Sequence, residues 1–95
     1  VVGDVADVDH VDQVLVHHRI EAVVHFAASA YVGESVTDPA KYYKNNTLNS
    51  LHLLERVRRL GIKRFVFSST CATYGVPPAV PITEDTPQKP INPYG

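Results

Sequence analysis

The stretch DPAKYYKNNTLNSLHLLERVRRLGIKRFVFSS, residues 38–69, joins the clearest helix of the chain to a short apolar strand. Asp38 is a helix-capping residue, and Pro39 stands at the first helical position, where its missing N–H leaves no hydrogen bond unmade. Gly61 ends the helix, because glycine adopts left-handed backbone angles without a Cβ clash. Residues 63–69 (KRFVFSS) follow as a run that predicts a buried strand.

The helix within this stretch has a periodic apolar pattern. Leu51, Leu54 and Val57 recur at three-residue spacing and predict the face that the helix buries. Arg58 and Arg59 suit its C-terminal end, where the helix dipole favours positive charge.

The same alternation of helix and strand extends upstream. Residues 8–18 carry apolar side chains at three- and four-residue spacing, and Asp7 can cap that helix. Residues 20–27 (IEAVVHFA) are almost continuously apolar, which fits a strand buried on both faces. Residues 1–4 (VVGD) look like the tail of another strand, and residues 28–37 (ASAYVGESVT) like a loop. We therefore predict an α/β chain that is part of a doubly wound parallel-sheet, Rossmann-type nucleotide-binding domain.

Composition argues against several classes of protein. A formal net charge of -1 without a basic block argues against a nucleic-acid partner, and no apolar run is long enough to predict a membrane span. Cys71 is the only cysteine, so an internal disulfide is impossible and a cytoplasmic location is predicted. The chain has no Met, and we expect it to be an excerpt of a longer protein.

Several residues suggest chemistry but have simpler interpretations. His10, His17 and His18 lack the spacing of a helical zinc pair, so no metal site is predicted. His25 lies in an apolar strand and is expected to be buried with a hydrogen-bond partner. Cys71 has no identifiable activating group and is expected to be a small buried residue beside the site.

Six motifs occur in an order and spacing that resemble the UDP-glucose 4-epimerases, which are NAD-dependent members of the extended short-chain dehydrogenase/reductase superfamily. They are GDVAD (3–7), VVHFAASAYVGESV (23–36), YYKNN (42–46), FVFSSTCATYG (65–75), PITED (81–85) and NPYG (92–95). The resemblance covers the whole chain. It implies that residues 1–95 are a partial NAD-binding domain, which lacks the N-terminal Gly-rich loop, a catalytic Lys beyond Gly95 and the C-terminal substrate domain.

The resemblance implies two catalytic residues, Tyr94 and Thr70. Tyr94 would take the proton of the sugar 4-hydroxyl, and Thr70 would hydrogen-bond to the same hydroxyl and help to transfer its proton. A free tyrosine is a poor base because its pKa is about 10. A neighbouring Lys and the positive nicotinamide would therefore have to stabilise the phenolate. Ser68 and Ser69 compete with Thr70 for this role, and all three also fit an ordinary strand end.

The cofactor-binding residues implied in the same way are Asp4, Val5, Phe26, Ala27, Ala28, Asn45, Ser68, Ser69 and Tyr94. Asp4 and Val5 would flank the adenine, the small residues after residues 20–27 would let the backbone approach the dinucleotide, and Asn45 would contact its nicotinamide end. Asp4 equally fits a turn, and the small residues equally fit core packing.

A few positions depart from the pattern or fit it less specifically. Ala30 replaces a Lys that contacts the cofactor ribose in some relatives, and this weakens the expected grip on NAD; a contact from the Tyr31 hydroxyl would partly replace it. Ser35 and Tyr74 could be ligand neighbours or structural residues.

The reaction implied is interconversion of UDP-glucose and UDP-galactose by C4 oxidation, rotation of the keto sugar and re-reduction. Related dehydratases carry Asp-Glu after the Thr of this strand, whereas this chain has Cys71 and Ala72, so elimination of water is not expected. The alternatives are 4-epimerisation of another UDP-sugar (UDP-N-acetylglucosamine or a UDP-pentose) and a non-catalytic NAD and nucleotide-sugar binding segment. A homodimer is expected, with Tyr42, Leu48 and Leu51 as candidate contacts.

Overall fold

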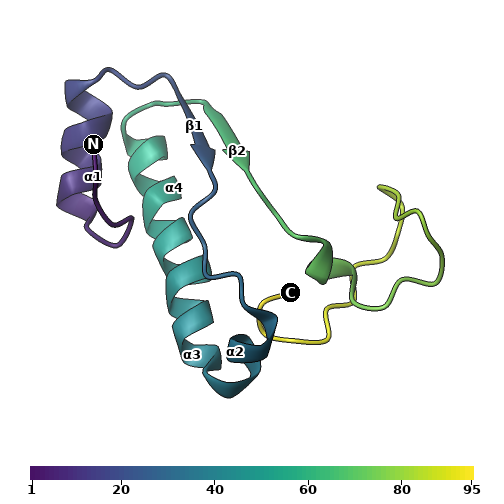
Figure 1. Cartoon of the computed structure of the whole chain (residues 1–95). Helices are drawn as coiled ribbons and strands as arrows, with labels where there is room; N and C mark the ends of the chain where they lie inside the picture. Colours follow the sequence, from purple (N-terminus) through teal and green to yellow (C-terminus); the bar gives the residue numbers. More distant parts are fainter.

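The computed structural model describes all residues, 1–95. Up to Tyr74 the chain forms helices and two parallel strands, and the C-terminal segment after it has no helix or strand (Figure 1). The elements are α1 (Val8–His17), β1 (Ala22–His25), α2 (Val32–Thr37), α3 (Pro39–Tyr42), the π-helical segment η1 (Tyr43–Leu48), α4 (Asn49–Arg59), β2 (Arg64–Phe67) and the 3-10 helix η2 (Cys71–Tyr74). None of these helices combines the length and the apolar character that a bilayer crossing demands.

The two strands form a parallel pair in which Ala22 lies opposite Arg64 and His25 opposite Phe67. Since β1 and β2 end together, the segments that follow them leave the sheet at the same edge. This edge is where the predicted site residues gather.

The core lies between the strand pair and the helices α1 and α4, which run side by side along one face of the sheet (Figure 1). Leu15, Leu53 and Val57 form its buried centre, and Val23 of β1 and Phe65 of β2 pack against them. The opposite face is uncovered, because Val24 and Val66 are 53% and 58% exposed. The prediction that both strands are buried on both faces was therefore wrong for this chain.

The helix signals in the sequence were confirmed. The Asp7 side chain accepts a hydrogen bond from the His10 N–H at the start of α1, and Asp38 accepts one from the Lys41 N–H at the start of α3. Gly61, with φ of +72°, follows α4 in the left-handed conformation.

Two element predictions were wrong. Residues 1–4 form no strand, because no neighbouring strand lies beside them to complete a ladder. Val32–Thr37, expected to be loop, is the short helix α2. Its own side chains satisfy its carbonyls, since the Ser35 hydroxyl donates to Val32 C=O at 2.7 Å and the Thr37 hydroxyl donates to Glu34 C=O at 3.1 Å.

The apolar face of α4 also differs from the prediction. Val57 and Leu53 are buried, whereas Leu51 and Leu54 are 53% and 41% exposed. Leu53 and Val57 are four residues apart and so share one face of α4, the face that packs against Leu15, whereas the three-residue pattern selected a neighbouring face.

Candidate active site

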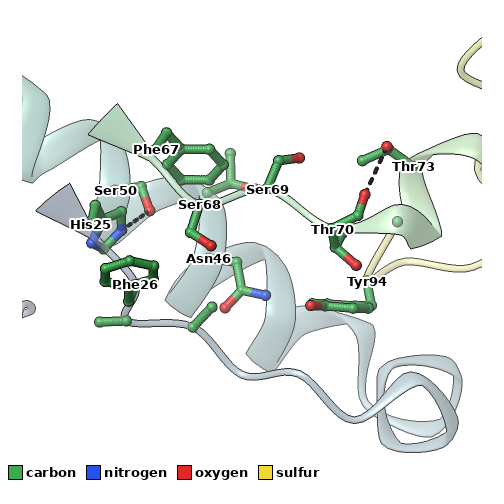
Figure 2. Close-up of a pocket in the computed structure, with 14 residues that line it drawn as sticks. His25, Phe26, Asn46, Ser50, Phe67, Ser68, Ser69, Thr70, Thr73 and Tyr94 are labelled. Carbon is green, nitrogen blue, oxygen red and sulfur yellow. Dashed lines mark hydrogen bonds between the residues drawn. The ribbon is translucent and has the colours of Figure 1, made fainter. Parts of the chain in front are cut away.

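A pocket of about 180 Å³ lies at the carboxyl ends of β1 and β2 (Figure 2). It brings together most of the residues predicted for the site, although they come from segments far apart in the sequence. The predicted residues that line it are Phe26, Ala27, Ala28, Ser68, Ser69, Thr70 and Tyr94. Phe26, Ala27 and Ala28 follow β1, Ser68 to Thr70 follow β2, and Tyr94 comes from the C-terminal segment.

A second hollow, of about 250 Å³, adjoins the first and shares Ala27 and Ala28 with it. The remaining predicted residues, Asp4, Val5 and Asn45, line this second hollow. All predicted site residues therefore lie on one of two adjoining hollows, which we call the composite site. Asn45 lies on the hollow of Asp4 rather than on that of Tyr94.

The Thr70 side chain lies between β2 and η2. Its hydroxyl oxygen accepts a hydrogen bond from the Ala72 N–H at 3.1 Å, which caps η2, and its carbonyl accepts one from the Thr73 hydroxyl at 2.9 Å. In Figure 2 the Thr70 hydroxyl points toward the Tyr94 ring. The end of β2 thus holds this hydroxyl on the pocket wall.

The Tyr94 ring lines the pocket, with its hydroxyl directed toward Asn46 in Figure 2. Its backbone N–H donates to Ser35 Oγ at 3.2 Å. The Tyr42 and Tyr94 rings form an edge-to-face pair, with the ring centroids 6.3 Å apart and the planes at 78°. Ser35 of α2 and Tyr42 of α3 therefore both contact Tyr94 and help to position it.

Asn46 is a pocket residue that the sequence analysis missed. Its Oδ1 accepts from the Ser29 N–H and its Nδ2 donates to the Ser29 carbonyl, both at 2.8 Å. Asn45 Nδ2 donates to Asn46 Oδ1 at 3.0 Å and to Ser29 Oγ at 3.3 Å. The signal in the sequence is the pair of adjacent asparagines in the YYKNN motif, of which the resemblance implies a role only for Asn45.

His25 and Ser50 form part of the pocket wall near the strand ends. His25 Nε2 and Ser50 Oγ are 2.8 Å apart, and His25 is only 5% exposed, so the prediction of a buried, hydrogen-bonded histidine was confirmed. Burial lowers the pKa of His25, because it disfavours the charged imidazolium. Ser50, which the sequence analysis did not single out, is the partner that satisfies this ring.

Behind Tyr94, polar side chains connect α2 to α3. Glu34 Oε1 accepts from Lys41 Nζ at 2.7 Å, and Glu34 Oε2 accepts from the Tyr42 hydroxyl at 2.7 Å. These two hydrogen bonds, from Lys41 first and then Tyr42, lower the pKa of Glu34, and the bond to Glu34 raises the pKa of Lys41. Desolvation, and then the bond to Glu34, raises the pKa of the Tyr42 phenol.

Other candidates have different surroundings from those expected. Cys71 was expected to be buried, but it is exposed at the first position of η2. Ser35 is fully buried and lines neither hollow of the composite site. Tyr31 is largely exposed and Tyr74 half-buried. No group of three or more His, Cys, Asp or Glu side chains is placed to hold a metal ion.

The chain is similar to known sugar-nucleotide enzymes. It is 55% identical over 93 residues to a probable UDP-arabinose 4-epimerase 3 of Arabidopsis thaliana, covering 98% of this chain and 23% of that protein. It is 54% identical to the UDP-glucose 4-epimerase of Rhizobium meliloti (strain 1021), covering 98% and 28%. The chain thus spans about a quarter of the length of the curated relatives it matches.

Solved structures agree with the predicted fold. The UDP-glucose 4-epimerase from Brucella ovis in complex with NAD matches with a TM-score of 0.94 and 51% identity, over 99% of this chain and 29% of that one. The corresponding enzyme from Bifidobacterium longum, in complex with NAD⁺ and UDP, matches with a TM-score of 0.91 and 42% identity, over 97% and 28%. The predicted Rossmann-type α/β fold and the resemblance to UDP-glucose 4-epimerases are confirmed.

A family model described as GDP-mannose 4,6 dehydratase matches residues 1–95, which is the entire chain. The chain therefore belongs to the family that this model describes.

Proposed function

We propose that this chain is part of an NAD-dependent UDP-sugar 4-epimerase that interconverts UDP-glucose and UDP-galactose. The observation that carries the proposal is the meeting of Tyr94 and Thr70 on one pocket at the carboxyl ends of two parallel strands. Ligands of open α/β sheets bind at this edge. The similar proteins named UDP-glucose 4-epimerase, and their structures with NAD, support the same assignment.

The composite site fits a dinucleotide. Ala27 and Ala28 lie where the two hollows meet, and their small side chains leave room for a ligand to pass between them. Asp4 and Val5 would hold the adenine end, while Ser68, Ser69 and Asn45 would supply polar contacts along the cofactor. Bound NAD would supply the acceptor and donor of the hydride at sugar C4.

In the proposed mechanism, the phenolate of Tyr94 takes the proton of the sugar 4-hydroxyl and returns it after the sugar has turned. Thr70 holds the same oxygen. Since Ala72 N–H occupies one acceptor position of the Thr70 oxygen, the hydroxyl proton of Thr70 remains to be donated toward the reacting oxygen.

Epimerisation is favoured over dehydration, although the family model is named for a dehydratase. Elimination of water needs an acid and a base beside the sugar. No Asp or Glu lines the pocket of Thr70 and Tyr94, and the positions after Thr70 hold Cys71 and Ala72. The chemistry that these side chains support is proton transfer at a single hydroxyl.

A UDP-pentose is the second candidate substrate. The observation that favours it is the 55% identity to a probable UDP-arabinose 4-epimerase, which equals the identity to the UDP-glucose 4-epimerase of Azospirillum brasilense. Both sugars would present a 4-hydroxyl to Tyr94 and Thr70, so the residues of this chain suit either reaction.

We also propose that residues 1–95 are a partial NAD-binding domain of a longer cytoplasmic protein that forms a homodimer. The share of each relative that the chain covers supports the first point, and the single cysteine supports the location. For the dimer, Leu48 and Leu51 are exposed, as are Tyr43 and Leu54 of the same helical stretch. Tyr42 is not proposed as a dimer contact, because its side chain is buried within the chain.

The test begins with the source gene on both sides of this segment, followed by expression of the whole reading frame. A Lys three residues beyond Gly95 and a Gly-rich loop before Val1 are expected. The purified protein should convert UDP-galactose to UDP-glucose, measured with a coupled dehydrogenase, and UDP-arabinose is assayed in parallel. Binding of NAD and UDP-sugar without turnover of either substrate would instead indicate the non-catalytic alternative.

A further inference from the structure

We propose that Ser35 is a positioning residue for Tyr94, through the hydrogen bond that its hydroxyl accepts from the Tyr94 backbone. The inference rests on the proposed function, in which the Tyr94 phenol reacts with the sugar. Ser35 is 0% exposed and lines neither hollow of the composite site. It therefore acts through Tyr94 and not by touching a ligand.

Both hydrogen-bonding directions of the Ser35 hydroxyl are used. Its proton goes to the Val32 carbonyl at 2.7 Å, within α2, and its oxygen accepts the Tyr94 N–H at 3.2 Å. Because the first bond fixes the hydroxyl proton, the oxygen lone pair is left to face the Tyr94 backbone. One side chain thus joins two segments that lie 59 residues apart in sequence.

This is the single hydrogen bond that connects residues 76–95 to the rest of the chain. That part of the chain has no helix or strand. Its other hydrogen bonds are local: they join Thr83 to Thr86, and Gly95 N–H to Asn92 Oδ1. Apart from packing, the placement of the Tyr94 phenol depends on its link to Ser35.

The second contact to Tyr94 comes from the same region and is itself held rigidly. The Tyr42 ring meets the Tyr94 ring in an edge-to-face arrangement, and the Tyr42 hydroxyl donates to Glu34 Oε2 at 2.7 Å and accepts from the Tyr31 N–H at 3.1 Å. Burial raises the pKa of Tyr42, so this hydroxyl keeps the proton that it donates to Glu34. The Tyr42 ring, against which Tyr94 packs, is therefore held in place by the bonds of its hydroxyl to Glu34 and to the Tyr31 N–H.

Loss of the Ser35 hydroxyl would leave the Tyr94 N–H without a partner and let the segment shift. A misplacement of about 1 Å at a reacting group can lower the rate roughly a hundredfold. The effect is expected in kcat and not in KM, because the bond orients a reacting group and contacts no ligand.

The experiment compares Ser35→Ala with Thr37→Ala in the full-length protein, assayed for C4 epimerisation. Thr37 is the matched control, because its hydroxyl also donates to a backbone carbonyl of α2 but makes no hydrogen bond with Tyr94. We expect Ser35→Ala to lower kcat roughly ten- to a hundredfold, with KM and bound NAD unchanged. Amide hydrogen exchange at Tyr94 should become faster in this variant alone, while Thr37→Ala should behave like the unaltered protein.

Three results would overturn the inference, and they can be told apart. Equal kcat for folded Ser35→Ala and Thr37→Ala overturns this role and leaves the proposed function standing. Absence of turnover by the unaltered protein overturns the proposed function and, with it, the role of Ser35. If Ser35→Ala fails to fold, Ser35→Cys has a similar volume and a weaker acceptor, and an unreduced kcat in that variant overturns the inference.

Discussion

One carboxamide, that of Asn46, holds both backbone polar groups of Ser29, accepting its N–H and donating to its carbonyl at 2.8 Å each. The bonds join η1 to the segment that leaves β1, where Ala27 and Ala28 line both hollows. The shape of the composite site thus depends on a residue that sequence reasoning passed over.

Asn46→Asp tests this tether. The carboxylate keeps the acceptor for the Ser29 N–H but loses the donor to its carbonyl and places negative oxygen beside it. A fully buried unsatisfied group costs about 1–3 kcal/mol. Because these bonds are only part-buried, we expect a loss in the free energy of unfolding at the lower end of that range, measured with urea. Lys44→Ala is the control, because Lys44 is exposed in the same π-helical segment. Equal stability of the two variants would contradict the tether.

Tyr94→Phe tests the proposed base. Removal of a general base lowers the rate by roughly a hundred- to ten-thousandfold, and we expect kcat of the epimerase reaction to fall by that much with the fold retained. Tyr74→Phe is the control, since Tyr74 does not line the pocket of Tyr94. A Tyr94→Phe variant with normal kcat would remove Tyr94 from the mechanism.

Three variants test which hydroxyl bonds to the sugar 4-hydroxyl, that of Thr70 or that of Ser69: Thr70→Val, Thr70→Ser and Ser69→Ala. Thr70→Ser keeps both the hydroxyl and its bond to the Ala72 N–H, so near-normal kcat is expected, whereas Thr70→Val should be strongly impaired. Ser69→Ala should keep most of its activity if Ser69 is a cofactor neighbour only. The opposite ranking, with Ser69→Ala impaired and Thr70→Val active, would transfer the catalytic role to Ser69.

His25 predicts a pH dependence of stability. Burial lowers its pKa in the folded state from the usual 6.5, so the unfolded state binds more protons as the pH falls below that value. Neutral, buried His25 therefore makes its full contribution to the free energy of unfolding above pH 6.5. That contribution is lost as the pH falls through the lowered pKa of the folded state. Glu34 acts in the same direction but at lower pH, below its ordinary 4.5.

The measurement is urea unfolding of His25→Gln and of the unaltered protein between about pH 7 and pH 5. We expect a shallower pH slope in His25→Gln, and His17→Gln, at an exposed position, should keep the slope of the unaltered protein. The difference in slope is limited to about 1.4 kcal/mol per pH unit for one proton. Identical slopes in all three proteins would mean that His25 does not titrate differently in the two states.

Local chemistry explains what the sequence could predict. Helix ends are marked by local residues. The carboxylates of Asp7 and Asp38 cap helix starts, and Gly61 has no Cβ that would oppose the left-handed turn after α4, so these roles do not depend on the rest of the fold. Thr70 and Ala27 lie at the same edge of the sheet because each follows one of two parallel strands that end together.

What the sequence could not predict depends on contacts distant in the chain. The π-helical turn at Asn45 and Asn46 is held by bonds to Ser29, and α2 closes partly through Glu34 and its partners in α3. Consecutive residues of a regular α-helix point about 100° apart, so a standard helical pattern assigns only one of the two asparagines to the site.

Leucines of α4 provide a test of which helix face is the core. Leu53 is 7% exposed and packs with Leu15 and Val57, whereas Leu51 is largely exposed. Leu53→Ala should cost about 2–5 kcal/mol of unfolding free energy, and Leu51→Ala should change it by less than about 0.5 kcal/mol when measured on the monomer.

The same pair also tests the proposed dimer. Because Leu51 lies on the exposed stretch with Leu48, Leu51→Glu should raise the dimer dissociation constant in sedimentation experiments without lowering the stability of the monomer. Leu53→Ala, in contrast, should weaken the fold itself. Dimerisation unaffected by Leu51→Glu would place the dimer contact elsewhere, and a large stability loss from Leu51→Ala in the monomer would return Leu51 to the core that the sequence pattern first predicted.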